Sequence, residues 1–220
     1  MSARPRVLVT RPRARARALA ERLEALGLEV SVCPLIETEP LSDDPLELSG
    51  YDWVVVTSRE GAAELLRRRR GPLPRVAAIG PGTAAALADG GVPADLVPAV
   101  STQEGLVEAF PRPPGRVAFV GAEGARRHLA DALGADFVPL YRTVELHPAE
   151  VPQADLVVLS SASAARAFAA LRRDVPAVTI GPQTSAAARR GGVRIAAEAA
   201  THDLDGLVAA VRSAACSSRS

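Results

Sequence analysis

The chain has 220 residues, enough for one large domain or two small ones, and 48% of them are hydrophobic, so it can bury a substantial core. Aromatic residues make up only 3% and the formal net charge is +1, which argues against nucleic acid and a membrane surface as partners. All 26 basic residues are arginine, which excludes a lysine Schiff base, a pyridoxal phosphate anchor and a phosphate-loop lysine.

Short apolar runs alternate with amphipathic Ala/Leu/Arg segments along the chain, which is typical of a parallel sheet covered by helices. Because these runs show little polar alternation, both faces of the sheet are expected to be covered. Strands are expected at residues 6–10, 29–33, 52–57, 75–79, 94–98, 116–120, 135–139, 154–159, 176–180 and 193–196. Helices are expected at residues 13–26, 59–69, 82–89, 102–110, 123–133, 162–172, 182–190 and 203–213.

We assign no ligand-binding role to two polar segments. The run Arg67–Arg70 closes one expected helix, and cations favour helix C-termini, so we interpret it as a solvated helix end. The small, polar tail 214–220 is expected to be disordered.

Cysteine and histidine usage indicates no metal site and no disulfide framework. Cys33 and Cys216 are isolated, and His128, His147 and His202 lack ligand spacing, so the histidines are interpreted as surface or capping residues. The chain shows no signal peptide and no apolar run of transmembrane length. We therefore expect a metal-free cytoplasmic protein.

The sequence repeats itself after about a hundred residues, far beyond the period of a solenoid. The matching segments are 54–62 with 157–165, 79–86 with 180–187, 104–110 with 205–211, and 6–40 with 116–148. Each copy is large enough to be most of a domain, which predicts two similar lobes with a ligand site between them.

Two divisions into lobes are compatible with this repeat. A sequential division would cut the chain at PRPPG, residues 111–115. A nested division would place 40–140 in one lobe and both flanks in the other, with crossings at PLIETEP (34–40) and PLYRTVELHP (139–148). The repeat alone leaves both divisions open.

A Gly-Pro-x-Thr turn opens a helix in each copy, at Gly80/Thr83 and at Gly181/Thr184. The first turn also matches a dinucleotide fingerprint, but the second copy lacks the second glycine and Asp95 begins the next strand instead of ending it. Free backbone N–H groups and a hydroxyl suit a carboxylate or phosphate. The simpler alternative is that the threonines only cap their helices.

Other small, hydroxyl or basic residues follow strands at the same sheet edge, where open α/β sheets bind ligands. They are Arg11, Thr57, Ser58, Arg59, Gly121, Ser160 and Ser161. The hydroxyls can cap the helices that follow or bind an anion at the positive helix end. The whole set predicts a site for a polyanion that is held mainly by backbone amides and hydroxyls. We find no catalytic triad or acidic pair, so catalysis would depend on orientation, with Tyr141 as candidate acid or, alternatively, a packing residue.

The ordered motifs resemble those of uroporphyrinogen-III synthase over nearly the whole chain. The set comprises VLVTRP (7–12), VVVTSREGA (54–62), AIGPGTAAAL (78–87), PLYRTV (139–144), VVLSSASAA (157–165), TIGPQTSAAA (179–188) and DGLVAAV (205–211). The resemblance implies an α/β fold of two similar lobes, each a parallel five-stranded, flavodoxin-like sheet flanked by helices, with a two-stranded linker. It favours the nested division, with residues 1–36 and 146–213 in one lobe and 40–140 in the other.

The resemblance implies a cofactor-independent, cyclising hydro-lyase of porphyrin and heme biosynthesis. Its substrate, hydroxymethylbilane, carries eight carboxylates, loses water from ring A and closes with inversion of ring D through a spiro intermediate. Tyr141 would assist departure of the hydroxyl. The family's binding residues match Thr57, Ser58, Gly80, Thr83, Ser160, Ser161, Gly181 and Thr184. We expect a monomer, with the preceding bilane-forming enzyme as a candidate partner.

One departure from the repeat concerns the loop at 101–105, where Thr102 corresponds to Asp203 in the second copy. An aspartate still caps a helix but is a poorer neighbour for a carboxylate.

Two rival functions stay open. A non-enzymatic two-lobe protein for a small polycarboxylate would give no turnover of the bilane, and a nucleotide-sugar transferase would bind nucleotides.

Overall fold

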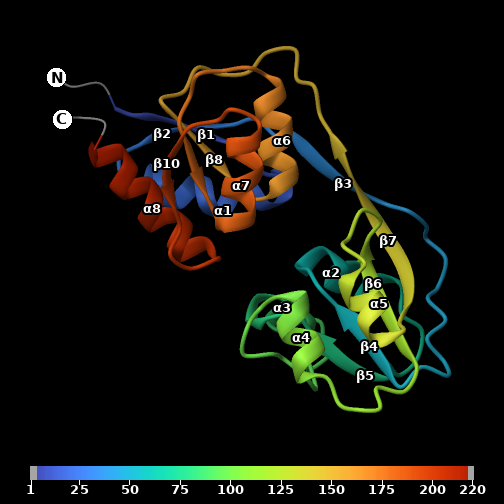
Figure 1. The fold of residues 1–220 in the computed structure, drawn as a ribbon. Coiled ribbons are helices and arrows are strands. Elements are labelled where there is room, and N and C mark those ends of the chain that lie inside the picture. The colour runs from blue at the N-terminus through green and yellow to red at the C-terminus, as the bar shows by residue number, and fades with distance from the viewer. Residues whose placement is uncertain (1–3, 218–220) are drawn as a thin grey trace. The chain divides into compact units, whose positions relative to one another are not determined.

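A computed structural model describes residues 4–217 and divides the chain into two compact units (Figure 1). Unit 1 combines the segment up to Glu37 with the segment from Val144 onward, and unit 2 is the contiguous segment Thr38–Thr143. Each unit contains one five-stranded sheet with helices packed on it. The chain passes from one unit to the other within two strands, β3 (Ile36–Pro40) and β7 (Asp136–Glu145).

The sheet of unit 1 is parallel throughout, with the strand order β10-β9-β8-β1-β2. Its strands are β1 (Arg6–Val9), β2 (Glu29–Val32), β8 (Leu156–Leu159), β9 (Ala177–Thr179) and β10 (Ile195–Glu198). Its helices are α1 (Arg13–Glu24), α6 (Ala162–Ala170), α7 (Pro182–Arg190) and α8 (Leu204–Ser217). Because all five strands run the same way, their carboxyl ends share one edge, from which the candidate residues of this unit project.

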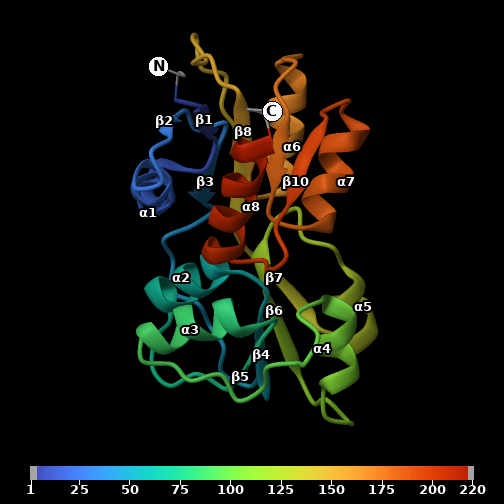
Figure 2. The ribbon, with the colours of Figure 1, turned by 90° about the vertical axis from the view of Figure 1, so that its left-hand side faces the viewer.

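Apolar side chains cover both faces of this sheet. Leu19 of α1 and Leu207 of α8 pack with Val7 and Val158 on one face. On the other face, α6 and α7 pack against Leu8 and its neighbours, and the two helices lie side by side in both views (Figure 2). Burial on both faces explains why the strand sequences are continuous Val/Leu runs.

The sheet of unit 2 is mixed, with the strand order β3-β7-β6-β4-β5. Its remaining strands are β4 (Trp53–Val56), β5 (Arg75–Ala78) and β6 (Val117–Ala122), and its helices are α2 (Arg59–Arg68), α3 (Pro81–Asp89), α4 (Gln103–Ala109) and α5 (His128–Leu133). Strands β4 to β7 are parallel to one another. Strand β3 runs against β7, because Leu41 N–H donates to the Leu140 carbonyl while Leu146 N–H donates to the Leu35 carbonyl. The expectation of a parallel sheet is therefore wrong at this edge.

Helices also cover both faces of the unit 2 sheet. Leu65 of α2 and Leu87 of α3 pack on one face, and Leu129 of α5 packs on the other. The second face contains the single tryptophan, Trp53, whose ring lies 5.0 Å from that of Phe110. Aromatic pairs of this kind add to the stability that burial provides.

The segment expected as a strand at 94–98 forms only one isolated bridge, between Ala77 and Leu96. Asp95 interrupts a longer pairing because its carboxylate accepts the Val76 N–H at 2.7 Å. Pro98, at the end of the segment, lacks the N–H that a ladder needs.

The helix expected at 123–133 begins only at His128. Gln103 of α4 supplies the partners that a preceding helical turn would provide, since its amide donates to the Arg126 carbonyl and accepts the Leu129 N–H. Arg126 also pairs with Glu104 at 2.8 Å. Hydrogen bonds to this guanidinium, and then to backbone, lower the pKa of Glu104 to about 2.

The tail expected to be disordered is in part the last turn of α8, which extends to Ser217. Ala214 and Ala215 are 7% and 5% exposed and pack in the core of unit 1, which explains why the helix continues. Residues 218–220 lie outside the described part of the chain. Within residues 4–217, no helix combines the length and the apolar character needed to cross a bilayer.

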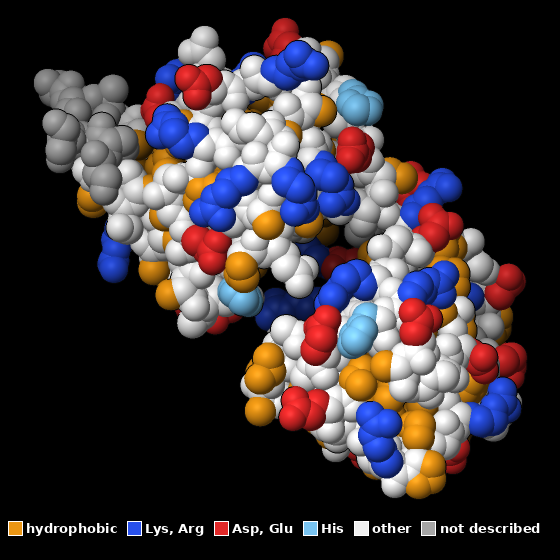
Figure 3. All heavy atoms as spheres, viewed as in Figure 1, with side chains coloured by type: hydrophobic (Ala, Val, Ile, Leu, Met, Phe, Trp, Pro, Cys, Tyr) orange, Lys and Arg blue, Asp and Glu red, His pale blue; other side chains and the backbone are white. Residues whose placement is uncertain are grey.

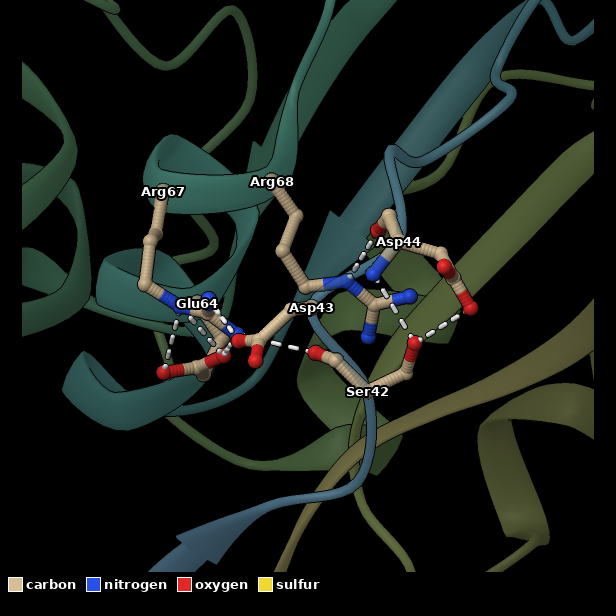
Figure 4. A network of polar contacts seen from close by, with 6 residues as sticks. All are labelled: Ser42, Asp43, Asp44, Glu64, Arg67 and Arg68. Atoms are coloured by element: carbon tan, nitrogen blue, oxygen red, sulfur yellow. Dashed lines mark hydrogen bonds and ion pairs between the residues drawn. The ribbon is translucent and has the colours of Figure 1, made fainter.

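The arginine run at the end of α2 is not a uniformly solvated helix end (Figure 4). Arg68 is only 8% exposed, and its guanidinium donates to the Asp44 carbonyl at 2.8 Å. Arg67 is paired with Glu64 at 2.8 Å and with Asp43. These two side chains therefore attach the loop that follows β3 to α2.

Candidate functional site

The hydroxyl of Tyr141 meets the start of α2 at the carboxyl edge of the unit 2 sheet. It lies 2.9 Å from Oγ of Ser58, and either oxygen can be the donor. Ser58 is the N-cap of α2 and accepts the Gly61 N–H at 2.9 Å, as predicted for a hydroxyl at this position. The Tyr141 side chain is 7% exposed and packs in the core of this unit. The contact unites two residues that lie 83 positions apart in the sequence.

Three other candidate residues of unit 2, Arg59, Gly121 and Thr57, lie at the same edge. The Arg59 Nε donates to the Gly82 carbonyl at 3.1 Å, and a Cβ on Gly82 would lie 3.1 Å from an Nη of the same guanidinium. The guanidinium of Arg59 therefore lies against the first turn of α3. A Cβ on Gly121, at the end of β6, would lie 3.6 Å from Oγ1 of Thr57.

The threonines of the two Gly-Pro-x-Thr turns do not cap their helices, so the capping alternative is wrong. The N-caps of α3 and α7 are Gly80 and Gly181, with proline as first helical residue. Thr83 and Thr184 occupy the third helical position and are 6% and 4% exposed. Within residues 4–217, neither hydroxyl makes a hydrogen bond. These hydroxyls consequently have donor and acceptor capacity left for another group.

Each glycine N-cap is covered by a residue of the loops at 101–106 and 202–207, which the sequence predicts to flank the mouth of the site but whose residues are not among the candidate site residues. A Cβ on Gly181 would lie 2.8 Å from two ring atoms of His202, and a Cβ on Gly80 would lie 2.9 Å from the Cβ of Ser101. These turns contain glycine because a second loop packs directly on them. The repeat offset of 101 residues relates Ser101 to His202, and it is the sequence signal that would have identified both.

The loops that carry Ser101 and His202 lead into capped helices. Thr102 accepts the Gly105 N–H at 3.0 Å, and Asp203 accepts the Gly206 N–H at 2.8 Å, so the expectation that an aspartate caps here is confirmed. The Gly206 N–H, followed by the Thr201 hydroxyl, lowers the pKa of Asp203. Asp203 is exposed at the same edge, so this loop of unit 1 carries a negative charge that unit 2 lacks.

The remaining candidates of unit 1 follow the ends of β1 and β8. Ser161 caps α6 by accepting the Ala164 N–H at 3.1 Å, and Ser160 precedes it directly. Arg11 follows Thr10, whose hydroxyl donates to the Val158 carbonyl at 2.9 Å and so connects the ends of the two strands. The candidates of unit 1 thus share one edge of one sheet.

Acidic and basic side chains are mixed on the one face that Figure 3 draws. On this face, acidic side chains accompany the arginines over both units. Among residues 4–217, no three His, Cys, Asp or Glu side chains converge in a way that could hold a metal ion.

Comparison with known proteins relates the chain to one family. The model of the family described as uroporphyrinogen-III synthase HemD matches residues 17–209. A uroporphyrinogen-III synthase of Synechococcus elongatus is 28% identical, with 93% of each chain aligned. A porphyrin biosynthesis protein HemD of Ruminiclostridium josui is 26% identical over 90% of this chain, which spans only 46% of that relative.

A solved structure shares the fold. A mutant uroporphyrinogen III synthase of Thermus thermophilus superposes with a TM-score of 0.63, at 19% sequence identity, and the alignment covers 97% of this chain and 99% of the other. At this level of identity the similarity establishes the α/β architecture of parallel strands and helices.

Proposed function

The chain belongs to the uroporphyrinogen-III synthase family, and on that premise we propose that it cyclises hydroxymethylbilane to uroporphyrinogen III in tetrapyrrole biosynthesis. The bond between carbon and the hydroxyl of ring A breaks, and the hydroxyl leaves as water after gaining a proton. The substituted α-carbon of ring D then bonds to the carbon that lost the hydroxyl, which gives a spiro intermediate. The bond from this α-carbon to the methylene of ring C breaks, the methylene bonds to the free α-carbon of ring D, and that carbon loses a proton, so the macrocycle closes with ring D inverted. The step balances without an oxidant or reductant, and we propose that no cofactor takes part.

The contact between Tyr141 and Ser58 is the observation that carries this proposal. A phenol assists departure of a hydroxyl if its proton points toward the leaving oxygen. When Ser58 donates its own hydrogen to the phenolic oxygen, the hydrogen of Tyr141 is not used in this contact, and we propose that it is directed at the leaving oxygen during the reaction. Ser58 is itself fixed by the Gly61 N–H, so the helix cap orients the acid.

We propose that the carboxyl edges of both sheets bind the acetate and propionate groups of the substrate. The starts of α3 and α7 offer backbone N–H groups and the unpartnered hydroxyls of Thr83 and Thr184. Arg59 adds a cation at the start of α3. The other proposed contacts are Arg11, Thr57, Ser58, Gly80, Gly121, Ser160, Ser161 and Gly181.

The strand order β2-β1-β8-β9-β10 supports a flavodoxin-like arrangement for unit 1. We propose that the two units serve as the two lobes of the family fold. One lobe comprises residues 1–36 and 146–213, and the other comprises residues 40–140. Strands β3 and β7 form the two-stranded linker that connects them.

The proposed activity predicts the isomer that the protein makes. Purified protein is supplied with enzymatically made hydroxymethylbilane in the presence of a chelator, and the porphyrins are separated after oxidation. We expect mainly the type III isomer, because uncatalysed closure gives type I. A ratio equal to that of the protein-free control would refute the enzyme, and binding of the bilane without turnover would support a polycarboxylate-binding protein.

Because the hydroxyls of Thr83 and Thr184 make no hydrogen bond within the described part of the chain, we expect their removal to change KM but not the free energy of unfolding. Thr83→Val and Thr184→Val keep the side-chain shape and remove a hydroxyl that makes no hydrogen bond, so the free energy of unfolding should change by less than about 0.5 kcal/mol. If the hydroxyls bind carboxylates, KM should rise in both variants. Ser161→Ala, which removes a cap, should instead lower the free energy of unfolding by about 1 kcal/mol. Unchanged KM in both valine variants would remove these residues from the binding set.

A further inference from the structure

A chain of hydrogen bonds inside unit 1 connects three successive elements. Thr179 ends β9, Ser185 lies on α7 and Glu198 ends β10. The hydroxyls of Thr179 and Ser185 lie 2.6 Å apart, both side chains are fully buried, and Ser185 donates to the Glu198 carboxylate. A hydroxyl has one hydrogen, so Thr179 must be the donor to Ser185. The donors thus run in one direction, from β9 through α7 to β10.

Unit 2 forms β5 and α3, the counterparts of β9 and α7, without this network, and it has only the isolated bridge at Leu96 where unit 1 has β10. At the repeat offset of 101 residues, the matching positions are Ala78, Ala84 and Val97. Helix α3 is nevertheless nine residues long, like α7, and has the same glycine cap and N-terminal proline. Apolar residues are therefore sufficient to form this helix and its first turn. Two of the three side chains are buried hydroxyls and Glu198 is exposed, and hydrogen bonds of this kind fix geometry more than they add stability, so the presence of the network in unit 1 requires another reason.

The network acts where the candidate residues of unit 1 lie. Ser185 directly follows Thr184, and its N–H donates to the Gly181 carbonyl at 3.0 Å, which is the first hydrogen bond of α7. Glu198 directly precedes the loop that places His202 on Gly181. The three hydrogen-bonded side chains consequently hold the first turn of α7 against the end of β10.

We propose that Ser185 and Glu198 are positioning residues that hold the first turn of α7, and with it Gly181 and Thr184, in the geometry that binds a substrate carboxylate. This inference rests on the proposed function, because the substrate supplies that carboxylate. The network touches no reacting atom, so its loss should weaken binding and leave the chemical step unchanged.

The variant Thr179→Ala/Ser185→Ala tests this role, because it installs the alanine pair that unit 2 already uses. The protein should fold with a melting temperature close to that of the wild type. Hydrogen exchange of the amides in the first turn of α7 should accelerate about tenfold, since a local opening becomes easier. KM for hydroxymethylbilane should rise about fivefold, the equivalent of one hydrogen bond, with kcat within a factor of two.

Glu198 provides an independent variant with a conservative rescue. Glu198→Ala should reproduce the exchange and KM changes, whereas Glu198→Gln should restore wild-type values because its amide oxygen still accepts from Ser185. Glu29→Ala, at an exposed position on β2 of the same sheet, is the matched control and should alter neither measurement.

Unchanged amide exchange in the double variant would overturn the positioning role. Faster exchange with unchanged KM would overturn its connection to substrate binding. If the wild-type protein makes no type III isomer, the proposed function is refuted instead. The exchange measurement needs no substrate, so it still decides whether the network holds the first turn of α7.

Discussion

Replacing Tyr141 with phenylalanine is expected to lower kcat about 100-fold, the loss typical of a removed general acid. The phenyl ring keeps its place in the core of unit 2, so the free energy of unfolding should fall only by about the 1 kcal/mol of one hydrogen bond. Product should bind as in the wild type. Single-turnover kinetics with hydroxymethylbilane, followed by separation of the isomers, measures both rate and outcome.

The isomer ratio separates an acid from a residue that only positions the substrate. A lost acid slows turnover while the product remains type III, whereas a lost positioning contact releases an intermediate that closes to type I. Tyr51→Phe is the matched control, because it removes the only other tyrosine hydroxyl, which donates to Asp136 at 2.9 Å. Wild-type rate and isomer ratio in Tyr141→Phe would make Tyr141 a packing residue.

Substitution of Gly206 by alanine should be the most destabilising single change at the edge of unit 1. The added Cβ would overlap the carbonyl oxygen of Thr201, and backbone cannot move aside as a flexible side chain does. Overpacking of this kind costs about 2–3 kcal/mol, which for a protein of this size lowers the melting temperature by about 5–10 °C. Gly105→Ala should behave alike, since its Cβ would overlap the Val100 carbonyl.

Gly124→Ala is the control for these variants, because a Cβ there has nothing within 4 Å and the backbone is not left-handed. Its melting temperature should match that of the wild type. If Gly206→Ala has the same melting temperature as Gly124→Ala, the loop from 199 to 203 adapts more easily than its packing on α7 indicates.

The sequence predicted most elements because their determinants are local. Continuous apolar runs identified β1, β4 and β8, and hydroxyls after strands identified the caps Ser58 and Ser161. The repeat also paired the turns at Gly80 and Gly181 correctly. In each case, a single stretch of chain contains the physical cause.

The failures share a non-local cause. The alternating Glu and Thr residues of β3 pair against β7, about a hundred residues away, and no pattern within 36–40 specifies that partner. The shortened start of α5 depends on Gln103, which lies on another helix. The same limit applied to the candidate site, where the contact of Tyr141 with Ser58 became visible only in the folded unit.

Trp53 makes the unfolding of one unit optically distinct. It is the single tryptophan of the chain, is 5% exposed, and lies in the core of unit 2 with Arg75 4.4 Å above its ring. Its fluorescence therefore reports on residues 38–143 alone, whereas far-ultraviolet circular dichroism averages over both units. In a denaturant titration, two coincident curves would show that both units unfold as one cooperative system, and separated curves would give each unit its own free energy of unfolding.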